Sequence, residues 1–164
     1  MTSFFGKYRG VVTDNNDPLM VGRIRARVPD VTGDADSGWA MPCAPFGGSS
    51  TGFFAVPAQG AGVWIEFEQG DADLPIWTGC WWDSAAEMQP GLLPDPQRVL
   101  LQTSGGHSIL LDDTPGTGGI TLHNHDGQTI ALTGAGIELG NGKGAAVALQ
   151  GPTVSLNGGA LEVT

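Results

Sequence analysis

Two histidines separated by one residue, His123 and His125, are the clearest candidates for metal chemistry. Residues two apart on a strand share a face, and three such pairs around one axis would supply an octahedral set of imidazoles suited to iron. The neighbouring Ile120 and Leu122 have the opposite parity, so a strand that turns these two inward turns both histidines outward. We therefore expect surface histidines and no metal or other cofactor, with a metal site at His123 and His125 as the less favoured alternative.

Paired carboxylates are the next candidates for chemistry. Asp112 and Asp113 are adjacent, so on a strand they point to opposite faces and cannot flank one scissile bond as in a glycosidase. They precede residues 114–116, Thr-Pro-Gly, and are better interpreted as turn formers. Glu66 and Glu68 share a face, but no histidine or basic residue accompanies them, which favours a solvated strand face. The sequence also has no Gly-x-Ser-x-Gly elbow, P-loop or zinc-binding helix motif, so we predict that the protein is not an enzyme.

The charge balance argues against a nucleic-acid partner. The chain has 17 acidic and 7 basic side chains, a formal net charge of −10, whereas phosphate contact needs clustered lysine and arginine. Most basic residues lie near the N-terminus, where Arg23, Arg25 and Arg27 alternate with aliphatic residues. We interpret these arginines as the solvated face of a strand whose other face is buried. A partner surface on the same strand is the alternative.

Composition points to an all-β protein made in the cytoplasm. The chain is 40% hydrophobic with 27 glycines and 11 prolines, and no stretch with helical periodicity exceeds about two turns; the best helix candidate is residues 84–88. The opening residues lack the apolar run of a signal peptide, and no segment approaches the length of a membrane span. Cys43 and Cys80 are expected to be free, buried thiols, and their pairing is left open.

The N-terminal half predicts a small barrel over residues 1–88. Five or six short strands with glycines at the bends suit a closed five-stranded OB-fold barrel. These strands are expected at residues 8–13, 21–28, 38–42, 52–57, 63–68 and 75–81, with an acidic loop at 29–37. A proline-rich connector follows at residues 89–98.

Five tryptophans, Trp39, Trp64, Trp77, Trp81 and Trp82, belong to this half. Aromatic side chains on a small barrel can stack bases or sugars. Because the chain is acidic, we favour core filling and contact with a neighbouring subunit.

The C-terminal segment, residues 99–164, repeats aliphatic pairs that are split by one residue and set between glycines and polar turns. Each pair puts two side chains on one face of a short strand, too few to build a core from one flat copy. The segment is therefore predicted to wind around an axis that it shares with other copies. The expected core residues are Val99, Leu101, Ile109, Leu111, Ile120, Leu122, Ile130, Leu132, Ile137, Leu139, Val147, Leu149, Val154, Leu156, Leu161 and Val163.

Several segments resemble one family. Residues 10–15 and 22–29 are similar to the first strands of phage baseplate spike proteins, as are residues 56–57 with 60–71, and residues 75–79; residues 105–116 resemble the entry to their shaft. The family is that of baseplate assembly protein V and the valine–glycine-repeat spikes of contractile phage tails and related injection systems. The resemblance implies an N-terminal OB-fold barrel followed by a C-terminal intertwined triple-stranded β-helix in a homotrimer, with backbone hydrogen bonds between chains.

The function that the resemblance implies is that of a central spike. The OB domains would attach to the baseplate hub protein at the tube end, the shaft would pierce the target membrane, and a PAAR-type tip protein would bind the C-terminal end. The protein would then reside in a virion tail baseplate or an assembled injection particle. Two alternatives are a monomeric β-solenoid adhesin that binds carbohydrate, which would need more regular repeat lengths, and an OB-type nucleic-acid-binding module, which the charge disfavours.

Overall fold

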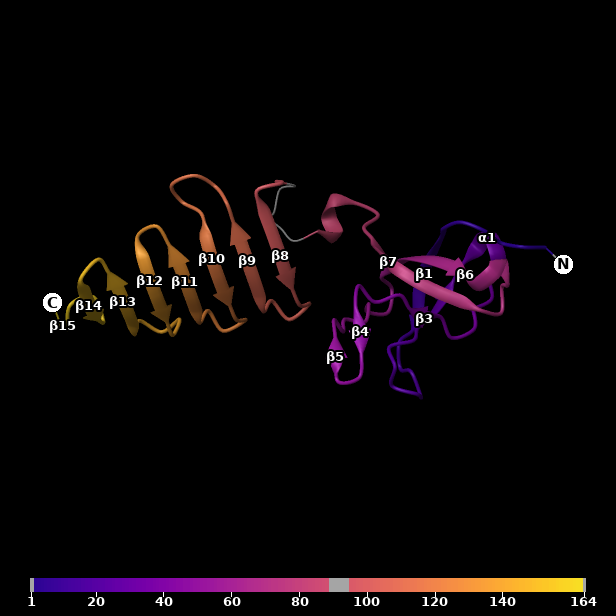
Figure 1. Ribbon diagram of the computed structural model, residues 1–164, viewed down its shortest axis with the longest axis horizontal. Coiled ribbons are helices and arrows are strands. Elements are labelled where there is room, and N and C mark those ends of the chain that lie inside the picture. Colours follow the sequence, from indigo (N-terminus) through magenta and orange to yellow (C-terminus); the bar gives the residue numbers. More distant parts are fainter. Residues whose placement is uncertain (1, 89–94, 164) are drawn as a thin grey trace. The chain divides into compact units, whose positions relative to one another are not determined.

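The computed structural model describes residues 2–88 and 95–163, so the predicted connector at 89–98 falls largely outside the described residues. The chain divides into two compact units, residues 1–90 and 91–164. Strands dominate both units (Figure 1), which confirms the all-β prediction. Within the described ranges, no helix is long and apolar enough to cross a bilayer.

The N-terminal unit is a curled five-stranded sheet. Its strand order is β2-β1-β6-β7-β3. A bridge between Ile24 and Ala40 links the two edges of this sheet, with backbone N–H to O=C distances of 3.2 and 2.8 Å. The sheet strands are β1 (Tyr8–Asp14), β2 (Arg25–Arg27), β3 (Met41–Pro42), β6 (Gly62–Phe67) and β7 (Pro75–Trp81). A separate hairpin pairs β4 (Gly47–Gly48) with β5 (Thr51–Gly52), and the helical turns are α1 (Pro29–Thr32), η1 (Glu68–Gly70) and η2 (Ala85–Glu87).

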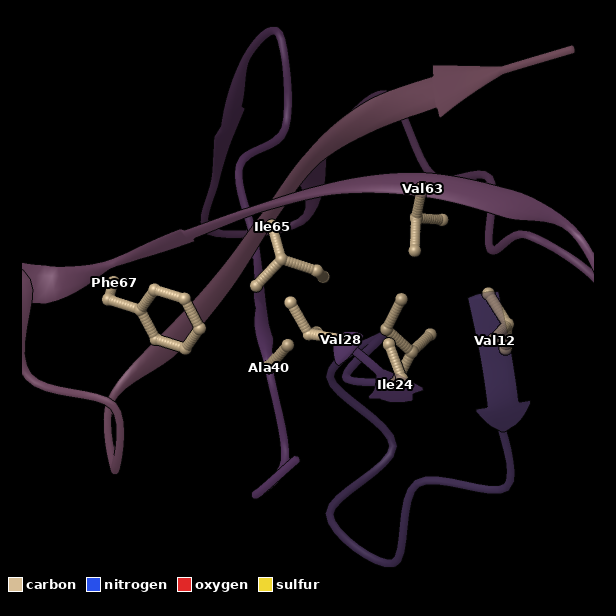
Figure 2. Close-up of a cluster of buried hydrophobic side chains, with 8 residues drawn as sticks. Val12, Ile24, Val28, Ala40, Val63, Ile65 and Phe67 are labelled. Carbon is tan, nitrogen blue, oxygen red and sulfur yellow. The ribbon is translucent and has the colours of Figure 1, made fainter. Parts of the chain in front are cut away.

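The barrel core comes from the inward face of each strand. Val63, Ile65 and Phe67 alternate with outward residues along β6, as the period of two requires. Figure 2 shows these side chains meeting Val12, Ile24, Val28 and Ala40 in the interior. The arginines of β2 point outward, because Ala26 between them is fully buried. The predicted solvated face is therefore confirmed for Arg25 and Arg27, but it was wrong for Arg23, whose side chain is 17% exposed and pairs with Asp17.

Several predicted element bounds were wrong. The strand expected at 21–28 is reduced to β2, because the Asp17 carboxylate accepts the backbone N–H groups of Val21 and Arg23 and holds this part of the chain in a loop. The strand expected at 52–57 ends at Gly52, where the β4–β5 hairpin closes and Phe53 N–H donates to the Phe46 carbonyl. The helical turn α1 begins at Pro29, inside the predicted loop, since proline suits the first helical position. The helix candidate at 84–88 is the single turn η2.

The C-terminal unit is one eight-stranded antiparallel meander, drawn as a strip from β8 to β15 in Figure 1. Each strand pairs with its neighbours in sequence, so the backbone hydrogen bonds that we expected between chains are made within one chain. The physical reason is that short turns bring consecutive strands together before any other copy is needed. The strands are β8 (Arg98–Gln102), β9 (Ser108–Asp112), β10 (Gly119–His123), β11 (Thr129–Thr133), β12 (Gly136–Gly140), β13 (Ala146–Gln150), β14 (Thr153–Leu156) and β15 (Leu161–Val163).

Three of the turns that connect these strands, all at the same end of the strands, close in the same way. In each, the side-chain oxygen of the first turn residue, Thr103, Asn124 or Asn141, accepts the backbone N–H four residues later. The donors are His107 at 3.2 Å, Gln128 at 2.9 Å and Ala145 at 2.9 Å. Because turn geometry fixes the register of a hairpin, these side chains help to set which residues face each other across the strands.

Gly136 and Gly134 provide a matched test of this packing. A Cβ at Gly136 would lie 2.0 Å from the Leu149 carbonyl oxygen, whereas one at Gly134 would meet nothing within 4 Å. We expect Gly136→Ala to destabilise the sheet by about 2–3 kcal/mol, because the backbone of β13 must move. Gly134→Ala should be tolerated. Thermal melting followed by circular dichroism checks both variants, and equal melting temperatures would contradict the register described here.

Candidate functional site

The register of the eight strands aligns the aliphatic pairs into two columns that cross the sheet. Residues opposite each other in an antiparallel sheet share a face, and every pair meets a pair on the next strand. One column follows the register positions Leu101, Ile109, Leu122, Ile130, Leu139, Val147, Leu156 and Leu161. The other follows Val99, Leu111, Ile120, Leu132, Ile137, Leu149, Val154 and Val163. We call the surface formed by these columns the aliphatic face.

Residue types alternate along each column. From β8 to β14 every strand carries a β-branched residue first and a leucine second, and the strand direction reverses at each turn. A β-branched residue therefore always faces a leucine, as Ile120 faces Leu132 and Leu122 faces Ile130. The order is reversed in β15, where Leu161 faces Leu156. Alternating shapes let neighbouring side chains interdigitate, which is the condition for dense packing against another surface.

The aliphatic face is open in a single chain. Ile120 and Leu122 are each 40% exposed, and Leu132 is 38% exposed, whereas Ile24, Val63 and Ile65 in the barrel core are fully buried. A cavity of about 900 Å³ lies along the face, and polar turn residues such as His107, Asn124 and Asn141 contribute to its wall. A continuous apolar surface of this kind marks an interaction site.

The opposite face of the sheet is different in character. Its central positions begin with Leu100 and Leu110 on β8 and β9, and from β10 to β14 they are small or polar: Thr121, Ala131, Glu138, Ala148 and Ser155. Small and hydroxyl side chains need no apolar partner. The two faces therefore predict one surface that is buried by association and one that stays in contact with water.

The structure places His123 on that opposite face, in register with Ser108 and Thr129. His125 lies in the following turn, where its backbone N–H donates to Nδ1 of His107 at 3.4 Å. His107 did not enter the metal hypothesis, because its distance in sequence hid its approach to His125. Across residues 2–88 and 95–163, no group of three His, Cys, Asp or Glu side chains lies close enough to hold a metal ion.

The candidate carboxylates have structural partners. Asp112 accepts hydrogen bonds from the backbone N–H of Thr114 at 2.9 Å and from Nε of Arg98 at 3.0 Å. Its contacts with Thr114, and then the charge of Arg98, lower the pKa of this carboxyl. Glu66 accepts a hydrogen bond from Lys7 at 2.8 Å, and Glu68 belongs to η1. These contacts close a turn and join neighbouring strands, so Asp112 and Glu66 each have a structural role.

The tryptophans divide between the core and the outer wall of the barrel. Trp77 packs against the core, and its Nε1 donates to the Gly22 carbonyl. The core-filling prediction was wrong for Trp82, which is 64% exposed, and for Trp39, Trp64 and Trp81, which lie on the outer wall beneath arginines. The guanidinium carbons of Arg23 and Arg25 lie 5.4 and 5.0 Å from the Trp39 ring centroid, and that of Arg9 lies 5.6 and 4.8 Å from those of Trp64 and Trp81. Cation–π attraction to the arginines stabilises these tryptophan rings although they lie outside the core.

Asp17 organises the loop between β1 and β2. Its carboxylate accepts the backbone N–H groups of Leu19, Val21 and Arg23 at 2.9–3.1 Å, and it forms a two-nitrogen ion pair with the Arg23 guanidinium at 2.9 and 2.6 Å. Its side chain is only 4% exposed. Arg23, and then these backbone donors, hold the pKa of Asp17 far below its ordinary value. We call this arrangement the Asp17 clamp.

Comparison with known families accounts for most of the chain. Residues 8–82 match the type VI secretion system/phage-baseplate injector OB domain, and residues 98–162 match the phage baseplate V C-terminal trimerisation domain. These matches confirm the resemblance on which the family prediction rests, including the OB domain, and they support assembly as a homotrimer. No curated protein sequence matches the chain significantly.

The Asp17 clamp predicts acid-sensitive stability. A carboxyl whose pKa is lower in the folded than in the unfolded chain stabilises the fold above the unfolded pKa, near pH 4, and this contribution is lost as the pH falls below it. We expect Asp17→Asn to lower the melting temperature of the barrel by several degrees near pH 7. The difference from the parent protein should shrink between pH 5 and pH 2 in circular dichroism melts. The exposed Asp34→Asn variant serves as the control, and a difference that does not change with pH would disprove the role of the charge.

Proposed function

Because the chain belongs to the phage baseplate assembly protein V family, we propose that it is the central spike of a contractile tail or a related injection system. The family supports a structural role in a baseplate. The observation that carries the finer proposal is the aliphatic face, a long apolar surface whose backbone is already hydrogen-bonded and whose side chains are half open. Such a surface is built for association and offers no chemistry.

In the proposed spike, three sheets turn their aliphatic faces toward a common axis. The sixteen residues of the two columns then form the trimer core. Burying the remaining two fifths of a side chain such as Ile120 stabilises the assembly by roughly 1 kcal/mol. Two sheets stacked face to face would also cover the columns. The match of residues 98–162 to a trimerisation domain favours three.

The proposed mechanism is mechanical. The strands of the meander run across the strip, so their hydrogen bonds run along its length. A compressive load along the strip is therefore borne by a continuous ladder of backbone hydrogen bonds and by the two packed columns. Sheath contraction would supply the energy of penetration, and the shaft would have to remain folded while it crosses the target membrane.

The two units take different parts in this proposal. Residues 1–88 form the OB domain that attaches to the hub protein at the tube end, residues 89–98 form the connector, and residues 99–164 form the shaft. A PAAR-type tip protein would bind the C-terminal end, where the reversed residue order of β15 interrupts the alternation of the columns. The assembled particle, a phage tail or an injection device, is the proposed location.

A pair of adjacent substitutions in β10 tests the trimer core. Leu122→Asp places a charge on the aliphatic face, and Thr121→Asp places the same charge on the opposite face. In the trimer the first variant would bury three carboxylates without partners, which costs several kcal/mol for each charge. We expect Leu122→Asp to abolish the trimer and Thr121→Asp to preserve it, as measured by light scattering after size-exclusion chromatography. Trimers of both variants, or a monomeric parent protein, would contradict the proposed core.

A further inference from the structure

The loop held by the Asp17 clamp presents two large apolar side chains to solvent. Leu19 is 64% exposed and Met20 is 87% exposed. Met20 also has a φ of +54°, a left-handed conformation that costs a non-glycine residue roughly 1 kcal/mol. A glycine would remove that strain and a polar residue would remove the exposed apolar surface, so a methionine here points to a use for its side chain. We call Leu19 and Met20 the knob.

A groove lies beside the knob on the same barrel. Its volume is about 700 Å³, and its wall includes Pro42, Cys43, Phe46, Phe53, Trp77 and Cys80. Those described residues that form the wall include no charged side chain. Leu19 and Met20 do not contribute to this wall, although the same loop supplies Val21 and Gly22 to it. The clamp and the bond from Trp77 to the Gly22 carbonyl fix this loop at the border of the groove.

Phe54 joins the two features into one surface. Its ring lies 3.1 Å from the position of a Cβ on Gly22, and it borders both the groove and the smaller hollow beneath Met20. Phe54 is nevertheless 75% exposed and Phe46 is 59% exposed. The barrel therefore carries an apolar projection and an apolar recess next to each other, both fixed in place and both without a covering element in the described parts of the chain.

We propose that the knob of one copy inserts into the groove of the next copy, so that the three OB domains close a ring of their own. When the knob of each copy enters the groove of the following copy the contact is heterologous, and three copies around a threefold axis close it into a ring. The inference rests on the threefold assembly of the proposed function.

A second copy is the favoured occupant because it is always close by. The chain between residues 88 and 95 spans at most roughly 25 Å. A shaft that holds three chains together therefore keeps three barrels at a high effective concentration. A clamped loop also loses little conformational entropy on docking, which favours such a contact.

Disulfide trapping in the full-length chain tests this contact with a native thiol. Met20→Cys places a cysteine on the knob, and Cys43 lies in the groove as a free thiol. Insertion would bring the two within bonding distance between copies. We expect mild oxidation to produce covalent dimers and trimers as the main bands on non-reducing gels. These bands should disappear in Met20→Cys/Cys43→Ser/Cys80→Ser, and they should not form in Asp73→Cys, which places an exposed cysteine elsewhere on the barrel.

The mass of the unoxidised proteins in solution distinguishes a failure of the knob-and-groove contact from a failure of the proposed trimeric spike. A trimeric parent protein whose Met20→Cys variant stays monomeric on the gel overturns the knob-and-groove contact and leaves the spike proposal standing. Bands that persist without the groove cysteines, or that form equally with Asp73→Cys, also overturn it. A monomeric parent protein refutes the threefold assembly itself.

Discussion

The structure depends on one property of the C-terminal sheet: its backbone polar groups are hydrogen-bonded within one chain, whereas its aliphatic side chains remain uncovered. Its backbone groups pair within one chain from β8 to β15, so no polar requirement for a partner remains along the interior strands. The aliphatic side chains are not buried, because each strand brings two of them to one face and nothing in the described chain covers them. Hydrophobic burial is therefore left as the force that assembles the copies.

The same division suits this sheet to the proposed shaft. Hydrogen bonds that stay within each chain give every sheet a defined register, and the turns closed by Thr103, Asn124 and Asn141 fix that register locally. The columns can then be straight and continuous, with a β-branched residue facing a leucine at each step from β8 to β14. A surface of regular shape can pack densely against identical copies of itself.

The barrel uses polar interactions for a different purpose. Asp17 accepts hydrogen bonds from three backbone N–H groups and pairs with the Arg23 guanidinium, and so fixes the loop between β1 and β2. On the outer wall, arginines cover Trp39, Trp64 and Trp81, so aromatic surface is partly shielded without entering the core. Leu19, Met20 and Phe54 are among the most exposed apolar side chains of this unit, together with Phe5 and Trp82.

The sequence alone determined the features that follow from backbone parity. The i, i+2 spacing identified which side chains share the aliphatic face, and the alternation of Arg25 and Arg27 with aliphatic residues identified the buried face of β2, because successive side chains on a strand always point to opposite faces. Tertiary structure decided the features that parity does not specify. The approach of His125 to His107 and the arginines over the tryptophans join segments far apart in sequence. The pairing of consecutive strands within one chain and the loss of the strand at residues 21–24 to the Asp17 clamp depend instead on how nearby turns and loops close. Parity is a property of the covalent chain, whereas a contact between distant segments depends on which of many possible partners the folded chain brings within reach.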